Sequence, residues 1–255
     1  MHNNQWHYMI NAPQAWITTG SSNVRIAVLD TGIDANHPLN LVNTSLGRSF
    51  VGGSTDVQGH GTHVAGTIAS YGSVSGVMQN ATLIPVKVLG DGSGSMYGIQ
   101  QGILYAASIG ADVINMSLGG GGYQGMDAIT AVASGTIVVA ASGNDGRGSI
   151  SYPAAYSAIA VGSVTSSTRS SFSNYGSGLE LMAPGSNIYS TYPNQYTLSG
   201  TSMATPHVAG VAGLIRAVNP NLSVAEARSI LNTAQYAGSQ YGYGIVDAAA
   251  VQAAG

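Results

Sequence analysis

Four segments of the sequence carry side chains that could do chemistry. Asp30 ends the apolar run AVLD, His60 and His63 lie in GHGTHVAGT, Asn144 lies in ASGNDG, and Ser202 lies in GTSMATPHVAG. A hydroxyl, an imidazole and a carboxylate are the groups of nucleophilic catalysis by serine, and an amide N–H can stabilise the oxyanion that such catalysis creates. Each segment by itself also has an ordinary structural interpretation.

These alternatives stay open while the segments are considered one at a time. Asp30 and Asn144 can stabilise turns through side-chain hydrogen bonds to the backbone, and Ser202 can cap the helix that follows it. His60 and His63 can face one metal ion, although no glutamate lies between them as it does in a metalloprotease helix. The same pair can equally hold one general base and one structural histidine.

Composition limits the classes of protein that the chain can belong to. Its 255 residues include no cysteine, and charged residues make up 7% of it, with a formal net charge of −3. Disulfides and thiolate metal sites are therefore excluded, and no basic stripe is present for nucleic acid. No apolar run is long enough to span a bilayer, so no membrane partner is expected. We expect a single domain over residues 1–255.

The elements that must position these side chains alternate along the chain. Apolar segments that predict buried strands are 23–32, 81–90, 111–120, 135–144 and 158–164. Segments that predict helices are 61–71, 96–110, 126–135, 202–218, 223–234 and 247–254. This alternation indicates a three-layer, doubly wound α/β fold, with a mostly parallel sheet and helices on both faces. Such folds have their sites at the carboxyl ends of the strands.

Considered together, the motifs resemble those of the subtilisin-like serine proteases, the subtilase family. The matching stretches are AVLDTGID, HGTHVAGT, AASGNDG and GTSMATPHVAG, in that order along the chain. The resemblance implies a serine endopeptidase in which Ser202 is the nucleophile, His60 the general base and Asp30 the residue that orients His60. It also implies an oxyanion hole formed by Asn144 and the backbone N–H of Ser202.

The same resemblance implies where a substrate would bind. A peptide is expected to lie as an extended strand between Ser93-Gly94 and Ser117-Leu118-Gly119. Small walls without a buried charge predict a broad specificity with a preference for large apolar P1 side chains. The walls expected for that pocket are Gly119, Gly120, Ala141, Ser142 and Gly143.

Departures from the family pattern bear on metal binding. Leu39 stands where relatives often have a carboxylate ligand for calcium, and the loop 69–77 is short. Because Ca²⁺ needs six to eight oxygen ligands, we expect no high-affinity calcium site here. A weak cation site near Glu180 and the carbonyls of Ala154 and Tyr156 is a further expectation. No cofactor is expected to be required for catalysis.

The resemblance also implies partners and a location. Polypeptides are the expected substrates, and a prosegment or a proteinaceous inhibitor is a possible partner. The chain is expected to be the mature form of a monomeric, extracellular protein, and a cytoplasmic location is the alternative. Two alternatives remain. The first is a catalytically inactive module that binds peptides in the same cleft, and the second is a metal-dependent hydrolase that uses His60 and His63.

Overall fold

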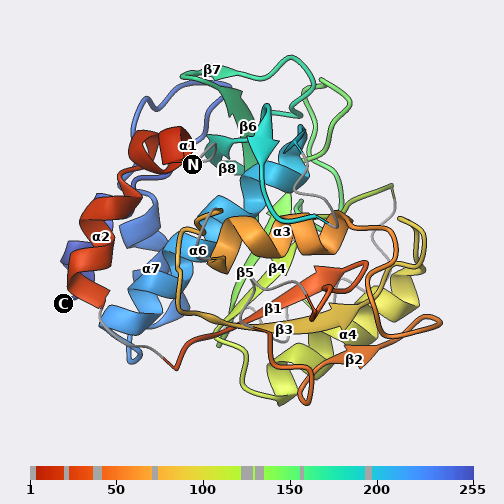
Figure 1. Cartoon of the computed structure of the whole chain (residues 1–255). Helices are drawn as coiled ribbons and strands as arrows, with labels where there is room; N and C mark the ends of the chain where they lie inside the picture. Colours follow the sequence, from red (N-terminus) through yellow and green to blue (C-terminus); the bar gives the residue numbers. More distant parts are fainter. Residues whose placement is uncertain are drawn as a thin grey trace.

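The computed structural model describes residues 4–19, 23–36, 42–70, 74–121, 129, 135–155, 158–192 and 197–255 (Figure 1). The helices are α1 (Asn4–Met9), α2 (Ala12–Thr19), α3 (His60–Ala69), α4 (Met96–Ser108), α6 (Thr201–Val218), α7 (Val224–Leu231) and the 3₁₀ helix η1 (Ala248–Ala254). The strands are β1 (Arg25–Asp30), β2 (Arg48–Ser49), β3 (Thr82–Lys87), β4 (Val113–Met116), β5 (Ile137–Ala141), β6 (Ile159–Thr165), β7 (Thr168–Arg169), β8 (Leu179–Pro184), β9 (Ile188–Tyr189) and β10 (Thr197–Leu198).

The larger sheet is almost entirely parallel. Its strand order is β2-β3-β1-β4-β5-β6-β7, and β8 pairs with β6 beside this path. Every pair except β6 with β7 is parallel. The central strands β4 and β5 are buried along their whole length, as expected of a parallel sheet covered on both faces.

Helices cover both faces of this sheet (Figure 1). Gly213 of α6 packs against Ile26 of β1, and Gly102 of α4 packs against Leu29 of the same strand. Ile26 and Leu29 are three residues apart, so their side chains point to opposite faces. The helices α4 and α6 therefore lie on opposite sides of the sheet, and the predicted three-layer α/β fold is confirmed.

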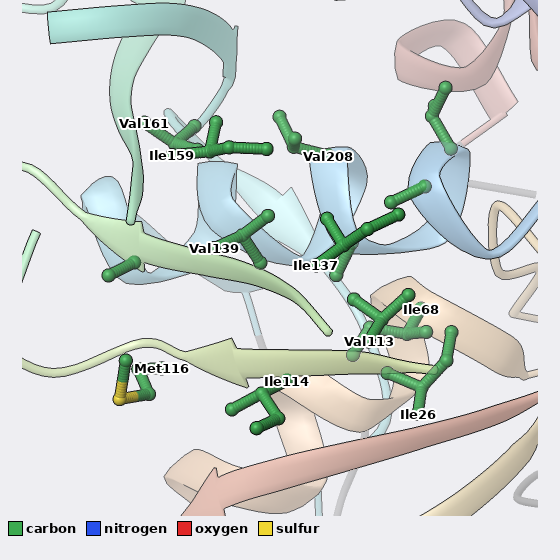
Figure 2. Close-up of a cluster of buried hydrophobic side chains, with 14 of the residues drawn as sticks. Ile26, Ile68, Val113, Ile114, Met116, Ile137, Val139, Ile159, Val161 and Val208 are labelled. Carbon is green, nitrogen blue, oxygen red and sulfur yellow. The ribbon is translucent and has the colours of Figure 1, made fainter. Parts of the chain in front are cut away.

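The main core lies between the sheet and α6. In Figure 2, Ile137 and Val139 of β5 lie on the side of the sheet that carries α6 and Val208, while Ile114 of β4 lies on the other side. These four side chains are 0% exposed. The wide apolar surface of α6 is thus buried in the core. This packing fixes the direction of the first turn of α6.

Most of the predicted elements are found in the structure. The five predicted strands correspond to β1, β3, β4, β5 and β6. Four of the predicted helices, over 61–71, 96–110, 202–218 and 223–234, correspond to α3, α4, α6 and α7. The last predicted helix is a 3₁₀ helix, η1. The helix predicted over 126–135 lies almost entirely outside the described residues. Nowhere in the described part of the chain is a helix both long and apolar enough to cross a membrane.

Candidate active site

Asp30 and His60 contact each other where β1 ends and α3 begins. Asp30 is the last residue of β1, and His60 is the first residue of α3. The His60 Nδ1 atom lies 2.7 Å from Asp30 Oδ1. The Asp30 side chain is fully buried, whereas that of His60 is 24% exposed. The carboxylate therefore holds one nitrogen of the ring, and the opposite side of the ring is accessible from outside.

A glycine allows this close approach of α3 to β1. Gly61 follows His60, and a Cβ atom at this position would lie 2.0 Å from the carbonyl oxygen of Gly32. Any side chain here would push the helix away from the end of β1. The glycine of HGTH therefore brings His60 within reach of Asp30.

The charge of Asp30 changes the proton affinity of His60. The largest effect is the attraction of the imidazolium form to Asp30, which raises the pKa of His60 above its ordinary value of 6.5. Burial opposes this effect, and the hydrogen bond to Asp30 and the charge of Asp56 add to it. His60 is therefore a stronger base than a free histidine.

Ser202 lies in the first turn of α6 without capping it. The N-cap residue is Gly200, and no side chain makes a capping hydrogen bond there. The Ser202 hydroxyl instead donates to the carbonyl oxygen of Ser117, at 3.1 Å. The Ser117 hydroxyl in turn donates to the carbonyl of Ser202, at 2.8 Å. The capping interpretation of Ser202 is wrong, and its hydroxyl is free of any role inside the helix.

The amide of Asn144 is fixed in one orientation by Thr201. The Asn144 Oδ1 atom accepts hydrogen bonds from the Thr201 backbone N–H and hydroxyl, at 2.8 and 2.9 Å. Because Oδ1 is used in this way, the Nδ2 group is left as a donor on the other side of the amide. Asn144 lines the same cleft as His60 and Ser202. An amide donor and a hydroxyl thus lie next to each other at one end of α6.

These side chains share one open cleft of about 550 Å³. The segments expected to bind a peptide, Ser93-Gly94 and Ser117-Leu118-Gly119, both line it. So does Gly120, whose backbone exchanges two hydrogen bonds with Tyr152. The wall at Gly120 therefore has the backbone pairing of a strand, which is the kind of wall to which an extended chain can be added.

A second hollow of about 350 Å³ adjoins Ser202. Of the walls predicted for the P1 pocket, Gly119, Gly120, Ala141 and Gly143 line it. Ser142 is not among its lining residues. This serine is fully buried, and its hydroxyl donates to the carbonyl of Asn174 behind the wall. Further lining residues that the sequence did not indicate are Asp145, Arg147 and Ser151.

The remaining histidines of these motifs are buried and bonded to backbone. His63 Nε2 donates to the carbonyl of Ile188 at 2.9 Å, and His207 Nδ1 donates to the carbonyl of Met203 at 3.0 Å. Burial lowers the pKa of His207 to about 3, so its ring is neutral. Within the described ranges, no three His, Cys, Asp or Glu side chains are grouped as metal ligands. His63 and His207 thus serve as structural residues.

The residues tied to cation binding are only partly described. Leu39, residues 71–73 of the short loop and Tyr156 lie outside the described residues. The Glu180 carboxylate is paired with the Arg228 guanidinium and also accepts from Asn232, at 3.3 Å. A cation at Glu180 would therefore have to compete with an arginine that already holds the carboxylate.

Several residues of this site were not singled out from the sequence. Asp56 is a buried carboxylate beside α3, and Thr201 orients Asn144. Their short polar motifs look like turns and caps, so no sequence signal separates them from such residues. The cleft also has an apolar wall, formed by Leu89, Met96 and Ile99. The sequence does not indicate this wall, because the same apolar residues are also expected at the end of a strand and on the buried face of a helix.

Comparison with known proteins identifies the family of the chain. Residues 21–246 match the Subtilase family. The chain is 50% identical over 249 residues to an alkaline protease of Alkalihalobacillus alcalophilus. The aligned region covers 91% of this chain and 64% of that protein. It is 49% identical over 249 residues to Subtilisin Savinase of Lederbergia lenta, with 91% of each chain covered. It is also 49% identical to Subtilisin DY of Bacillus licheniformis over 243 residues, with 88% of each chain covered.

Proposed function

The chain belongs to the subtilase family, and from the geometry of its cleft we propose that it is a serine endopeptidase that uses Asp30, His60 and Ser202 as a catalytic triad. The observation that carries this proposal is the 2.7 Å contact between His60 and a fully buried Asp30, at a cleft that Ser202 also lines. Neither alternative function is favoured by the structure or by the relatives. A metal-dependent hydrolase would need the His63 ring, which is buried and bonded to Ile188.

Hydrolysis begins with attack by Ser202 on the peptide carbonyl. The hydroxyl rotates from the Ser117 carbonyl towards His60, whose Nε2 atom accepts its proton. Asp30 holds Nδ1–H, so the ring presents the correct nitrogen, and its negative charge stabilises the imidazolium that forms. His60 then gives the proton to the leaving amine, and an acyl-enzyme remains on Ser202. Water hydrolyses this ester by the same steps in reverse order.

The oxyanion of the tetrahedral intermediate is stabilised at the start of α6. The Asn144 Nδ2 group and the Ser202 backbone N–H are the donors that face it. Thr201 orients the first donor, and the N-terminus of α6 adds its partial positive charge. In subtilisin, one such side-chain donor contributes about 10²–10³ in kcat.

Substrate specificity is proposed to come from the hollow beside Ser202. Its glycine and alanine walls leave room for a large side chain. Asp145 and Arg147 at its edge are 64% and 56% exposed and lie 3.7 Å apart, so they offer no buried charge to a P1 residue. Large apolar P1 side chains therefore gain most from entering it, because they leave water without losing hydrogen bonds.

A series of N-blocked tetrapeptide anilides that differ only at P1 tests this function. With Phe or Leu at P1, kcat/KM should exceed the value for Asp at least about 10²-fold, because burying an unpaired charge is costly. The Ser202→Ala protein serves as the blank for each substrate. A flat series would overturn the proposed specificity, and no hydrolysis of any member would contradict the endopeptidase itself.

The proposal extends to partners, metals and location. A prosegment or proteinaceous inhibitor would bind the same cleft as an extended chain, as polypeptide substrates do. We propose that no metal is needed for catalysis and that the protein lacks a high-affinity calcium site, because Leu39 replaces a carboxylate. A weak cation site at Glu180 would require that Arg228 be displaced. We also propose that the protein acts as a monomer outside the cell.

A further inference from the structure

Asp56 is a buried carboxylate that lies four residues before His60. Asp56 is 7% exposed. Its carboxylate forms no ion pair with any of the described residues. A buried charge without a cation is costly unless hydrogen bonds compensate for it. The retained charge therefore needs an explanation, and it lies next to the proposed catalytic base.

Four hydrogen bonds hold this carboxylate. Its Oδ1 atom accepts from the Thr31 hydroxyl at 2.9 Å and from the Gly59 backbone N–H at 2.7 Å. Its Oδ2 atom accepts from the Thr62 backbone N–H at 2.9 Å and from the Thr62 hydroxyl at 2.6 Å. The donors thus come from the residue that follows β1 and from the N-cap and first turn of α3, next to Asp30 and His60.

This arrangement gives α3 the cap that its own N-cap residue lacks. Gly59 is the N-cap of α3 and has no side chain to accept from the first amides. Asp56 accepts from two of these amides instead, where a negative charge is also favoured by the helix dipole. Thr31, which follows Asp30, donates to Asp56 and accepts from the Gly61 N–H at 2.9 Å. The end of β1 and the first turn of α3 are therefore tied to one carboxylate.

The charge of Asp56 also acts on His60 directly. Among the groups around the ring, Asp30 and Asp56 raise the pKa of His60, with Asp30 the larger of the two causes. Lys87 of β3 is a cation near this site, because it lies beside Asp30 in the register of β1 and β3. Its Nζ atom donates to the carbonyl of Thr55 at 2.7 Å, beside Asp56. Apart from His60, none of the described residues that line the cleft, such as Ser117 after β4 and Ser202 of α6, carries a charged side chain.

We propose that Asp56 is a positioning residue of the triad, which holds His60 against Asp30 through α3 and whose buried negative charge favours the imidazolium formed when Ser202 attacks. This inference rests on the proposed endopeptidase function. It assigns to Asp56 an electrostatic effect on the reaction, in addition to its hydrogen bonds. Asp56 does not line the cleft, so its effect should appear in kcat and leave KM nearly unchanged.

The test is the Asp56→Asn substitution, which keeps the shape of the side chain and removes the charge. In the wild type, the acid limb of kcat/KM should have its midpoint above pH 6.5, because protonated His60 cannot accept the Ser202 proton. Without Asp56 the pKa of His60 falls, so the ring stays neutral to lower pH. The midpoint should move down by up to about 1 pH unit, and kcat at the plateau should fall by up to about tenfold.

The control is Asp112→Asn, which removes a charge at the other end of β1. The Asp112 carboxylate accepts from the Arg25 N–H, and Arg25 lies about 16 Å from Asp30 at the rise of an extended strand. The Asp112→Asn substitution should leave the acid limb of kcat/KM unchanged. If circular dichroism shows that the Asp56→Asn protein is unfolded, Asp56→Ser takes its place. Serine removes the charge without directing an amide N–H at the Thr62 donors. The same shift is expected of it.

A second readout does not depend on catalysis. The imidazole protons of His60 can be titrated by NMR in Ser202→Ala protein, with and without the Asp56→Asn change. A lower midpoint in the double variant supports the proposal even if the wild type shows no peptidase activity, so the two hypotheses fail separately. Unchanged NMR midpoints and acid limbs, together with a loss of stability alone, would show that Asp56 is only structural.

Discussion

Replacement of Ser202 with alanine is expected to lower kcat by about 10⁶, the size established for removal of the nucleophile of subtilisin. The hydroxyl is the only group in the proposed mechanism that bonds covalently to the substrate, so no neighbour can substitute for it. Among the described residues, the Ser202 hydroxyl bonds to the Ser117 carbonyl alone. Loss of one such bond costs about 1 kcal/mol, so the variant should fold normally. Initial rates with the best P1 anilide measure the loss, and thermal unfolding checks the fold.

Ser229→Ala is the matched control for this change. Ser229 is an exposed serine of α7 whose hydroxyl donates to the Ala225 carbonyl at 3.0 Å. Its removal takes away the same atom and a similar hydrogen bond, far from the cleft. The control should keep wild-type kcat. Retention of more than about one hundredth of the wild-type rate in a pure Ser202→Ala preparation would exclude Ser202 as the nucleophile.

Replacement of Asp30 with asparagine is expected to lower kcat by about 10⁴, the size known for this residue in serine proteases of two folds. Asparagine keeps the shape but has no charge, so the imidazolium that forms at His60 loses its strongest stabilisation. The amide can also turn its N–H towards His60 Nδ1, which would favour the wrong tautomer. KM should change little, because Asp30 is fully buried and does not touch the substrate. A kcat and KM determination separates the two effects.

The acid limb gives an independent check on the same variant. Without the Asp30 charge, the pKa of His60 should fall, and the residual activity should persist to lower pH than in the wild type. A loss of kcat smaller than tenfold, with an unmoved acid limb, would show that the contact between Asp30 and His60 has no part in catalysis.

The fold could be predicted where the pattern of the sequence is strong and local. The strands that end near the cleft are apolar runs that stop at glycine turns, so β1, β4 and β5 were found. The sequence does not predict β8, because its six residues, LELMAP, form a short pattern that ends in proline. This segment is a strand mainly through its pairing with β6. Its conformation is fixed by the neighbouring strand more than by its own residues.

The sequence does not predict helices α1 and α2, for a related reason. Helix α1 has six residues, and α2 has eight, with Pro13 in its first turn. Such short helices are not stable alone and depend on tertiary contacts. Helix α2 packs against η1 and α6, which lie more than 180 residues away along the chain. No local pattern in this region predicts those contacts.

The sequence predicts a set of residues for the site but not their geometry. Nothing in the spacing of Asp30 and His60 gives a distance of 2.7 Å, which depends on the tight packing of Gly61 against Gly32. The displacement of Ser142 from the predicted pocket wall has a similar origin. Successive side chains of an extended segment alternate in direction, and the hydroxyl of Ser142 turns inward to Asn174.

The most direct test of the proposed triad is labelling of the intact protein with a fluorophosphonate, followed by mass mapping of the modified residue. The probe reacts with a serine that an adjacent base activates, so it reports the nucleophile and the base together. We predict one label per chain, on Ser202, with labelling that decreases on acidification as His60 is protonated. Labelling absent from the folded protein, or found on a serine other than Ser202, would contradict the triad of Asp30, His60 and Ser202.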